Sequence, residues 1–485
     1  MPIDQGPLVL SGIPPQILDV VQSRTWERMF HDALFPELLF RVDAAPREWA
    51  AHVGARIAMT RTGLLTVKTT PRNPSTEPSP SSYPIEQWEA TAAQYVDGID
   101  TNLREATFAL ANQFIQNIHT LGLGAGQTLN HIARNQLYSA YLGGETSYDG
   151  TEGTPLTLSA TAPTSFHVPQ LAGFLTMIQV QNNQAIPQAL SVSNPLPVVL
   201  RAGGTGPVLA TAIASTPDNI AYPTGPGTIT IAALSIANVL NTGDAVVALN
   251  ESFRRRIGGG YSDNALTSTS IVTLQDFINS VANLRAFNVP PHSAGVNGQP
   301  GDYYHAHISP LTEAEVFADS AWQRALTALP DSFYYRRLAL GQVAGIIFLR
   351  NTETPSPQSI QPGENFPWPA YNSNGVPIIR DIITGGGVMF EMFINEAKYY
   401  ISEAGVTGKI GQVVVTANGA QVNVDRVRLI LRSPIDRFQE LVSGSYSYTG
   451  DFPIPSDITS PQVIANPTNI GSNIRYKRAV TLIHA

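Results

Sequence analysis

Two histidines at alternate positions are the residues whose spacing could most directly do chemistry. In YYHAHISP, His305 and His307 would point to one face of a strand, where both could bind a metal ion if a carboxylate joined them. The sequence identifies no third ligand, so we favour two polar positions on a solvated or subunit-facing strand surface. We therefore expect no metal site, no cofactor and no catalytic residue.

A glycine-rich segment and a basic cluster are the next candidates. GLGAGQT, from Gly122, is similar to a phosphate-binding loop, but it lacks the Lys-Ser/Thr pair and follows a helical pattern. Arg254, Arg255 and Arg256 form the only tight basic cluster and could face DNA phosphates or an acidic neighbour; a solvated exit loop is the alternative. The sequence contains no cysteine, no G-x-S-x-G and no His-Glu-x-x-His, so it lacks the residues that identify most hydrolases.

The composition describes a long, apolar chain with little charge. It has 485 residues, of which 43% are hydrophobic and 14% charged, with a net charge of -8 at pH 7. This length exceeds what one hydrophobic core supports, which predicts several domains. The scarcity of charge indicates that much of the surface is buried against other subunits. No signal peptide or long apolar run is present, so we expect no membrane partner.

The N-terminal third predicts helices on both sides of a thin hairpin. An amphipathic arm helix precedes strand-like segments from Ala51 to Thr70 and in IEQWEATAAQYV, separated by a Pro/Ser-rich tip. Such a hairpin cannot bury a core of its own, so something outside must hold it. Residues 102–142 then have helical spacing, and the glycines of GLGAG predict a break or a close backbone crossing, with two helical pieces favoured over one.

The rest of the chain combines short strands with capped helices. Many short apolar runs between Gly150 and Gly258 predict an inserted β-barrel or sandwich. Capping boxes at Thr273 (TLQD) and Thr312 (TEAE) predict two helices, the second running to about Leu326, on either side of the strand YYHAHISP. A further helix is an option over 396–404. The remaining strands are expected in QVAGIIFLR, GVMFEMFI, KIGQVVVTA, VDRVRLILR and IRYKRAVTLI.

This order of segments resembles the major capsid proteins of tailed bacteriophages, whose fold is shared with encapsulins and the herpesvirus capsid floor. The resemblance rests on the hairpin and four collinear segments: AGQTLNHIARNQLYSAYLGG, TLQDFINSVANLRAFNVPP, DYYHAHISPLTEAEVFADSAWQRAL and RYKRAVTLIHA. It implies an α+β fold with an N-terminal arm, an extended β-hairpin loop, a long helix, peripheral and axial domains, and an inserted all-β domain.

The implied domains follow the chain in order. They are the N-terminal arm (1–50), the extended hairpin loop (51–98), a long helical segment of the peripheral domain (99–149), the inserted β domain (150–258), a mainly axial domain (259–432) and a C-terminal return to the peripheral domain (433–485). Because the sequence starts directly with the arm, we expect a separate scaffolding protein instead of a fused one.

The resemblance also implies function. It predicts a non-enzymatic virion protein, assembled in the bacterial host cytoplasm, whose pentamers and hexamers form an icosahedral head. Expected partners are its own copies, scaffolding protein, portal, a decoration protein, and double-stranded DNA packaged without sequence specificity. Cross-linked capsids occur in the family, and Lys68 is the only lysine of the loop. The expected inter-subunit contact residues are Trp26, Arg56, Arg61, Lys68, Glu86 and Trp88.

Two other readings of the sequence remain alternatives. The first is an encapsulin-like compartment shell, which would enclose cargo instead of a genome. The second is a β-rich carbohydrate-binding protein of a phage tail or surface. An enzyme ranks third, because it would rest only on His305 and His307.

Overall fold

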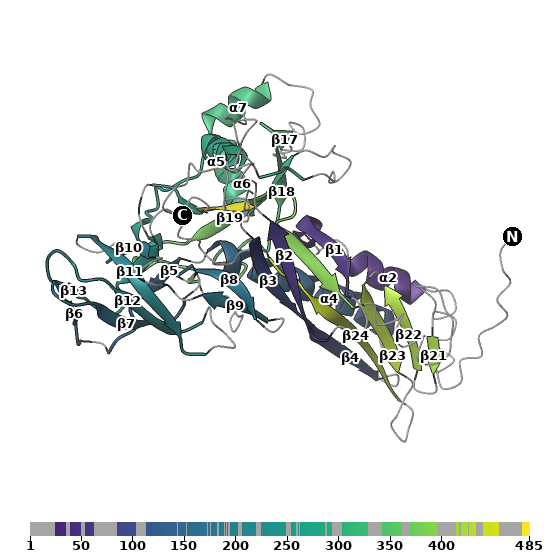
Figure 1. The fold of residues 1–485 in the computed structure, drawn as a ribbon. Coiled ribbons are helices and arrows are strands. Elements are labelled where there is room, and N and C mark those ends of the chain that lie inside the picture. Colours follow the sequence, from purple (N-terminus) through teal and green to yellow (C-terminus); the bar gives the residue numbers. More distant parts are fainter. Residues whose placement is uncertain are drawn as a thin grey trace, which may run out of the picture. The chain divides into compact units, whose positions relative to one another are not determined.

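The computed structural model mixes helices with many strands (Figure 1), which confirms the predicted α+β class. It forms two units: unit 1 contains described parts of Met1–Arg56, Ala90–Ala133 and Phe390–Phe452, and unit 2 contains those of Ile57–Glu89, Arg134–Met389 and Pro453–Ala485. The residues described are 25–34, 39–49, 54–62, 85–102, 113–142, 144–151, 153–171, 173–174, 176–181, 184–188, 190, 192, 195–201, 206–219, 225–248, 254–258, 260, 262–286, 289–292, 303–327, 342–360, 368–394, 414–416, 419–424, 426–432, 440–454 and 478–485.

Unit 1 is organised around one long antiparallel pair of strands. β24 runs beside β4 from the pair Leu441–Asn102 to the pair Gly450–Ala93, and β23 lies on the other side of β24. The sheet order is β1-β20-β24-β23-β22-β21, with β4 off this path. Its strands are β1 (Ala44–Glu48), β4 (Ala93–Asn102), β20 (Met389–Phe393), β21 (Val414–Thr416), β22 (Gly419–Val424), β23 (Val427–Arg432) and β24 (Leu441–Asp451).

The long helix α4 (Gln113–Tyr141) covers one face of this sheet with its first turns. Alternate residues of β24 point toward it: the space beside Gly444 is filled by Ile118, and the Tyr446 hydroxyl lies 3.2 Å from the Thr128 hydroxyl. Unit 1 also contains α2 (Thr25–Leu34) and the short 3-10 helix η2 (Phe40–Asp43).

The structure corrects half of the prediction made for GLGAG. The helix is continuous, so the expected break is wrong, but the close backbone crossing is confirmed at Gly122. A Cβ atom there would lie 2.7 Å from the Phe30 carbonyl oxygen of α2 and 3.0 Å from Ala33, whereas one at Gly124 would meet nothing within 4 Å. The absence of a side chain at Gly122 therefore allows the close approach of α2, whereas Gly124 plays no part in this contact.

This difference predicts opposite effects for two alanine substitutions. Gly122→Ala is expected to lower the free energy of unfolding by about 1–3 kcal/mol, because the backbone of α2 must move away. Gly124→Ala is the matched control and should raise it by up to about 1 kcal/mol, because alanine favours the helix. Urea unfolding of both variants checks this, and equal effects would contradict the assigned crossing.

Unit 2 contains a two-stranded hairpin and a β-rich segment over residues 144–248. In the hairpin, β2 (Arg56–Thr62), whose first residue is grouped with unit 1, pairs with β3 (Ile85–Thr91); the connecting residues 63–84 lie outside the description. The second predicted arm, IEQWEATAAQYV, is divided, because its residues from Ala93 onward belong to β4 of the unit 1 sheet. The β-rich segment forms a six-stranded antiparallel sheet, β5-β14-β10-β11-β12-β7, and the pairs β6-β13 and β8-β9. These strands are β5 (Glu145–Ser147), β6 (Leu156–Leu158), β7 (Thr164–Val168), β8 (Thr176–Gln181), β9 (Gln184–Gln188), β10 (Leu196–Leu200), β11 (Val208–Pro217), β12 (Gly227–Ile231), β13 (Asn238–Leu240) and β14 (Ala245–Ala248).

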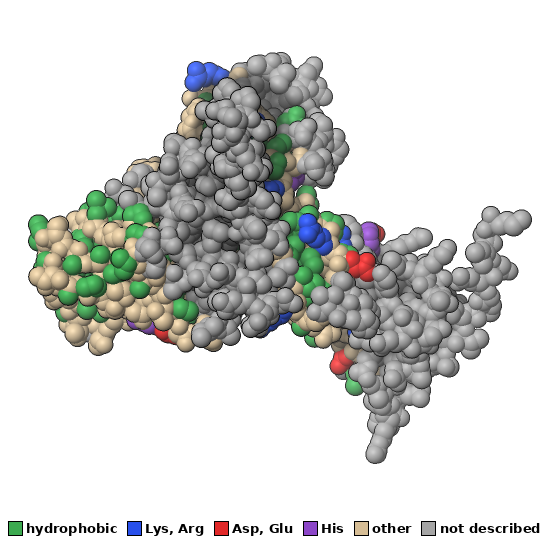
Figure 2. Space-filling model, viewed as in Figure 1, with side chains coloured by type: hydrophobic (Ala, Val, Ile, Leu, Met, Phe, Trp, Pro, Cys, Tyr) green, Lys and Arg blue, Asp and Glu red, His purple; other side chains and the backbone are tan. Residues whose placement is uncertain are grey.

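This six-stranded sheet has its own hydrophobic core and almost no charge. Its strands alternate, so that one face buries a set of apolar side chains that includes Phe166, Val198, Ile229 and Val246. Residues 150–250 contain only four Asp, Glu, Lys or Arg residues. Figure 2 accordingly shows mainly hydrophobic and uncharged side chains over this segment.

A second six-stranded sheet of unit 2 is mixed, with the order β15-β25-β19-β16-β18-β17. Its strands are β15 (Arg254–Arg256), β16 (Tyr304–Ile308), β17 (Gln342–Val343), β18 (Ile346–Arg350), β19 (Ile379–Thr384) and β25 (Ala479–His484). The helical elements beside it in sequence are η3 (Asp263–Ala265), α5 (Leu274–Ala286), α6 (Pro310–Ala318) and α7 (Ser320–Thr327). Phe348 of β18 packs edge-on against Phe277 of α5 and Trp322 of α7, which fixes these helices on the sheet.

The predicted capping boxes have different outcomes. α5 starts as predicted, because the Asp276 carboxylate accepts from the Thr273 backbone at 3.1 Å and from its hydroxyl at 2.7 Å. The second helix starts earlier than predicted, since Ser309 is its N-cap, accepting from the Thr312 backbone at 3.1 Å, and Pro310 is its first residue. It also ends at Ala318, because Asp319 interrupts it before α7 begins. The option of a helix over 396–404 lies outside the described residues.

Candidate functional site

Several fully buried polar groups of unit 2 lie in or beside the central strand β19. Its residues Arg380 and Asp381 are consecutive, so their side chains leave opposite faces of the sheet, and both are fully buried. Two buried charges in one strand are costly unless each is paired and hydrogen-bonded. Each of them accordingly belongs to a separate network.

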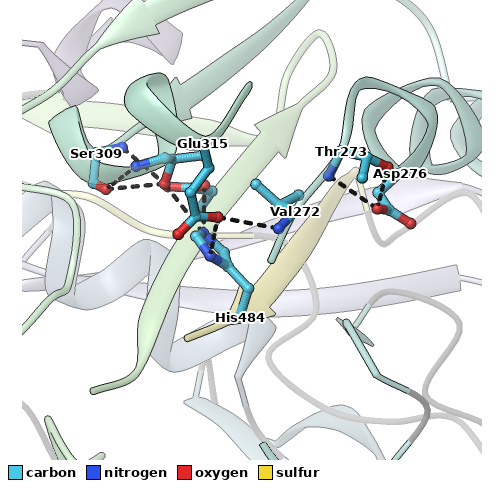
Figure 3. Close-up of polar contacts among 8 residues, drawn as sticks. Val272, Thr273, Asp276, Ser309, Glu315 and His484 are labelled. Carbon is cyan, nitrogen blue, oxygen red and sulfur yellow. Dashed lines mark hydrogen bonds and ion pairs between the residues drawn. The ribbon is translucent and has the colours of Figure 1, made fainter. Parts of the chain in front are cut away.

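The Asp381 network joins the last strand, β25, to helix α6 (Figure 3). The imidazole of His484 lies between two carboxylates, with Nε2 3.1 Å from Asp381 and Nδ1 3.1 Å from Glu315. Asp381 also accepts from the backbone of Ser309, the N-cap of α6, at 3.0 Å. Glu315 accepts from the Val272 backbone at 3.1 Å, just before α5. One histidine therefore links a strand to the starts of two helices.

The surroundings of His484 favour its protonated form. Burial opposes the charged ring, but the contacts with Asp381 and Glu315 and their negative charges outweigh it and raise the pKa of His484 to about 9. The sequence segment RYKRAVTLIHA gave no sign of this role, because its two carboxylate partners lie 103 and 169 positions earlier in the chain. The ion pairs of His484 therefore connect β25 with β19 and α6.

The Arg380 network joins the two ends of the β-rich segment 144–248 to the mixed sheet. Asp263 accepts from Arg380 and from Arg256, each at 3.0 Å, and Arg256 also pairs with Glu145. Glu145 is the first residue of β5, at the start of this segment, and Arg256 is the last residue of β15, which follows its end. Their ion pair therefore connects the two ends of the segment, and Asp263 attaches both to β19.

Unit 1 has a buried ion network of its own. The Glu391 carboxylate of β20 is fully buried and accepts from Arg41 Nε at 2.8 Å, pairs with Arg426, and lies 3.3 Å from the Tyr448 hydroxyl. Burial, followed by the charge of Glu391, raises the pKa of Tyr448 well above its usual value. The carboxylate thus connects η2, β20 and β24 with the start of β23.

The structure places the predicted basic cluster in a strand, not in a solvated loop. β15 pairs in parallel with β25, and Arg255 forms an ion pair with Asp276 at 2.9 Å. Arg256 forms ion pairs with two carboxylates, and its side chain is 7% exposed. Arg256 therefore serves the fold, and little of it is available to a phosphate. The side chain of Arg254 lies outside the described residues, and its DNA-facing role stays a prediction, as does that of Arg255.

The two candidate metal-binding histidines are buried, so the expectation of a solvated or subunit-facing surface is wrong. His305 and His307 are 1% and 0% exposed, because β16 is an interior strand of the mixed sheet. The His305 ring stacks in parallel on His292 at 3.9 Å, and His307 Nδ1 lies 3.4 Å from the Asn351 amide. These contacts give both rings a packing role.

The predicted inter-subunit residues are only partly described. Arg56 is exposed at the start of β2. The backbones of Trp26, Arg61, Glu86 and Trp88 belong to α2, β2 and β3, but their side chains lie outside the described residues. Lys68 lies outside them entirely. Their role at subunit contacts stays a prediction.

Comparison with known proteins gives similarity to phage capsids. No family model matches the chain, and neither does any curated protein. The capsid of Ralstonia phage GP4 is similar over 92% of this chain and 91% of that one, at 10% identity and a TM-score of 0.46. The capsid of cyanophage Pam1 has 8% identity over 91% and 89%, with a TM-score of 0.47. That of cyanophage P-SCSP1u has 11% identity over 91% and 86%, with a TM-score of 0.43. Among the described residues, no helix is long and apolar enough to cross a membrane.

Proposed function

We propose that this chain is the major capsid protein of a tailed bacteriophage, a structural subunit whose pentamers and hexamers form an icosahedral head around double-stranded DNA. The observation that carries the proposal is the hairpin of β2 and β3, which pairs with no third strand among the described strands. A two-stranded ribbon is marginal in water on its own. A neighbouring subunit is the support that such a hairpin needs.

The distribution of charge supports the same proposal. Three ion networks, around Glu391, Asp263 and His484, are buried and join distant segments, which suits a rigid structural subunit. Only 14% of the chain is charged, which suits a surface that is largely covered by copies of itself. Each contact can then be weak, because the closed shell repeats it many times.

The proposed partners follow from this role. They are other copies of the chain, a separate scaffolding protein, the portal, a decoration protein and packaged DNA, with assembly in the host cytoplasm. Sedimentation velocity of the purified protein tests the self-association directly. We expect species of five or six subunits or larger, and a monomer at all concentrations would contradict the proposal.

Deleting the hairpin tip tests the assembly role of the extended loop. Removal of residues 73–82 should leave the free energy of unfolding within about 0.5 kcal/mol of wild type, because loop shortening changes closure entropy only slightly. The same deletion is expected to abolish closed shells, which electron microscopy of the expressed variant would reveal. Normal particles from a folded variant would show that the tip makes no necessary contact.

A further inference from the structure

The two edge strands of the inserted sheet, β5 and β7, approach each other beyond the end of β5. The Asp149 backbone N–H donates to the His167 carbonyl at 3.5 Å, and the Tyr148 ring packs edge-on against Phe166 with centroids 6.0 Å apart. These contacts form a seam between the residues that follow β5 and the edge strand β7. The seam covers backbone groups that an open sheet edge would expose.

His167 lies at this seam with a carboxylate at each of its ring nitrogens. Nδ1 is 2.7 Å from Asp149 Oδ2, and Nε2 is 2.7 Å from Asp218 Oδ2. Asp149 follows β5 and Asp218 follows β11, where its backbone N–H is bonded to the Pro226 carbonyl at 3.0 Å. One imidazole therefore joins two connecting segments to the edge strand.

This two-sided geometry requires a proton. A neutral imidazole has one N–H, so its other nitrogen would turn a lone pair toward a carboxylate at 2.7 Å; imidazolium donates from both. The strand opposite, β12, is uncharged and pairs Thr228 with His167. The nearby Asp244 carboxylate is occupied by the Asn241 backbone N–H at 2.8 Å. Asp149 and Asp218 are thus the charged groups that face the ring among the described residues.

We propose that His167 is a proton-operated clasp of the inserted domain, which holds the segments after β5 and β11 to β7 when it is protonated and releases one of them when it is neutral. Release would expose the edge of β7 to pairing with another strand. The inference concerns the inserted domain alone and does not depend on the proposed capsid role.

The direction of the pH effect follows from the contacts. The hydrogen bond to Asp218 is the largest influence, partial burial opposes it, and Asp149 adds to it, so that the pKa of His167 is raised above 6.5. A raised pKa means that the clasp stabilises the folded state fully below the unfolded value and is lost as pH rises through the folded value. The seam should therefore be tighter in mild acid than in mild base.

Hydrogen exchange of the full chain, read by mass spectrometry at about pH 6 and about pH 9, tests the clasp where histidine changes charge. After correction for intrinsic exchange, peptides spanning 145–151 and 164–168 should be about twofold to fivefold more protected at the lower pH, the range expected for exposed ion pairs. His167→Gln should remove this pH dependence, and Asp149→Asn or Asp218→Asn should reduce it.

Two comparisons keep the test decisive. His31→Gln, a change at an exposed histidine of unit 1, should leave the pH dependence of the seam peptides intact. If His167→Gln does not fold, Asp218→Asn provides the same readout, because it removes one of the two acceptors. Equal protection of the wild-type seam at both pH values, or an unchanged pH dependence in these variants, would overturn the proposal.

Discussion

Replacing Glu391 with glutamine is expected to lower the free energy of unfolding of the unassembled chain by about 3–5 kcal/mol, the usual effect of removing one partner from a buried ion pair. The carboxylate is fully buried, and the Arg41 side chain that it holds at 2.8 Å is only 7% exposed. Glutamine keeps the shape but removes the negative charge with which the buried Arg41 guanidinium pairs. Arg426 is 23% exposed and can turn toward water, so the loss falls mainly on Arg41.

Urea unfolding followed by tryptophan fluorescence measures this effect. Asp97→Asn is the control: Asp97 is exposed on β4 and bonds the neighbouring Gly98 backbone, so it should change stability by less than about 0.5 kcal/mol. An Arg41→Met/Glu391→Met double variant should recover much of the loss, because apolar replacement removes both buried charges. A loss below about 1 kcal/mol for Glu391→Gln would show that the network is not a main source of stability.

The second large effect is expected at His484 and depends on pH. Its pKa is raised from 6.5 to about 9 in the folded chain, so its contribution is complete below pH 6.5 and disappears as pH rises through about 9. By linkage the wild type should lose on the order of 3 kcal/mol of stability from this residue across that window. His484→Gln should be destabilised in acid and should show a much flatter dependence over the same range.

Denaturant midpoints measured at several pH values across the window check this prediction. His167→Gln should be included, because His167 titrates in the same direction, although its exposure makes its contribution smaller. His31→Gln is the control for an exposed histidine and should follow the wild-type curve. If His484→Gln keeps the full wild-type pH dependence, the clamp between Asp381 and Glu315 is not what holds β25.

Local signals made much of the fold predictable. The TLQD box placed the start of α5 correctly, since Thr273 and Asp276 satisfy each other's backbone whatever the rest of the chain does. The apolar runs placed β18, β20 and β23, because a buried strand is encoded by a short apolar segment. The start of α6 was misplaced because Ser309 and Pro310 form the actual N-terminus.

The two central strands were absent from the prediction for opposite reasons. β19 contains the charged pair Arg380 and Asp381, which interrupts its apolar residues. The segment therefore lacks the continuous apolar run that predicts a buried strand. β24 contains serine at positions 443, 445 and 447, so it looks like a turn-rich segment. Its alternation with Val442, Tyr446 and Tyr448 is a period-two signal that could have identified it.

The ion networks could not be predicted from the sequence at all. Arg41 and Glu391 lie 350 positions apart, and Arg380 lies 117 positions from Asp263, so no spacing rule relates them. The buried state of His305 was missed for a related reason: alternation in YYHAHISP shows which residues share a face, but only the strand order shows that both faces are covered. Burial of polar groups is a property of the assembled sheets.

Negative-stain electron microscopy of the purified protein, expressed alone and together with its candidate scaffolding protein, tests the central claim most directly. A subunit that relies on neighbours to support the β2–β3 hairpin should form closed shells, or uniform capsomers of five or six subunits, in at least one of the two preparations. A persistent monomer in both preparations would contradict the capsid role.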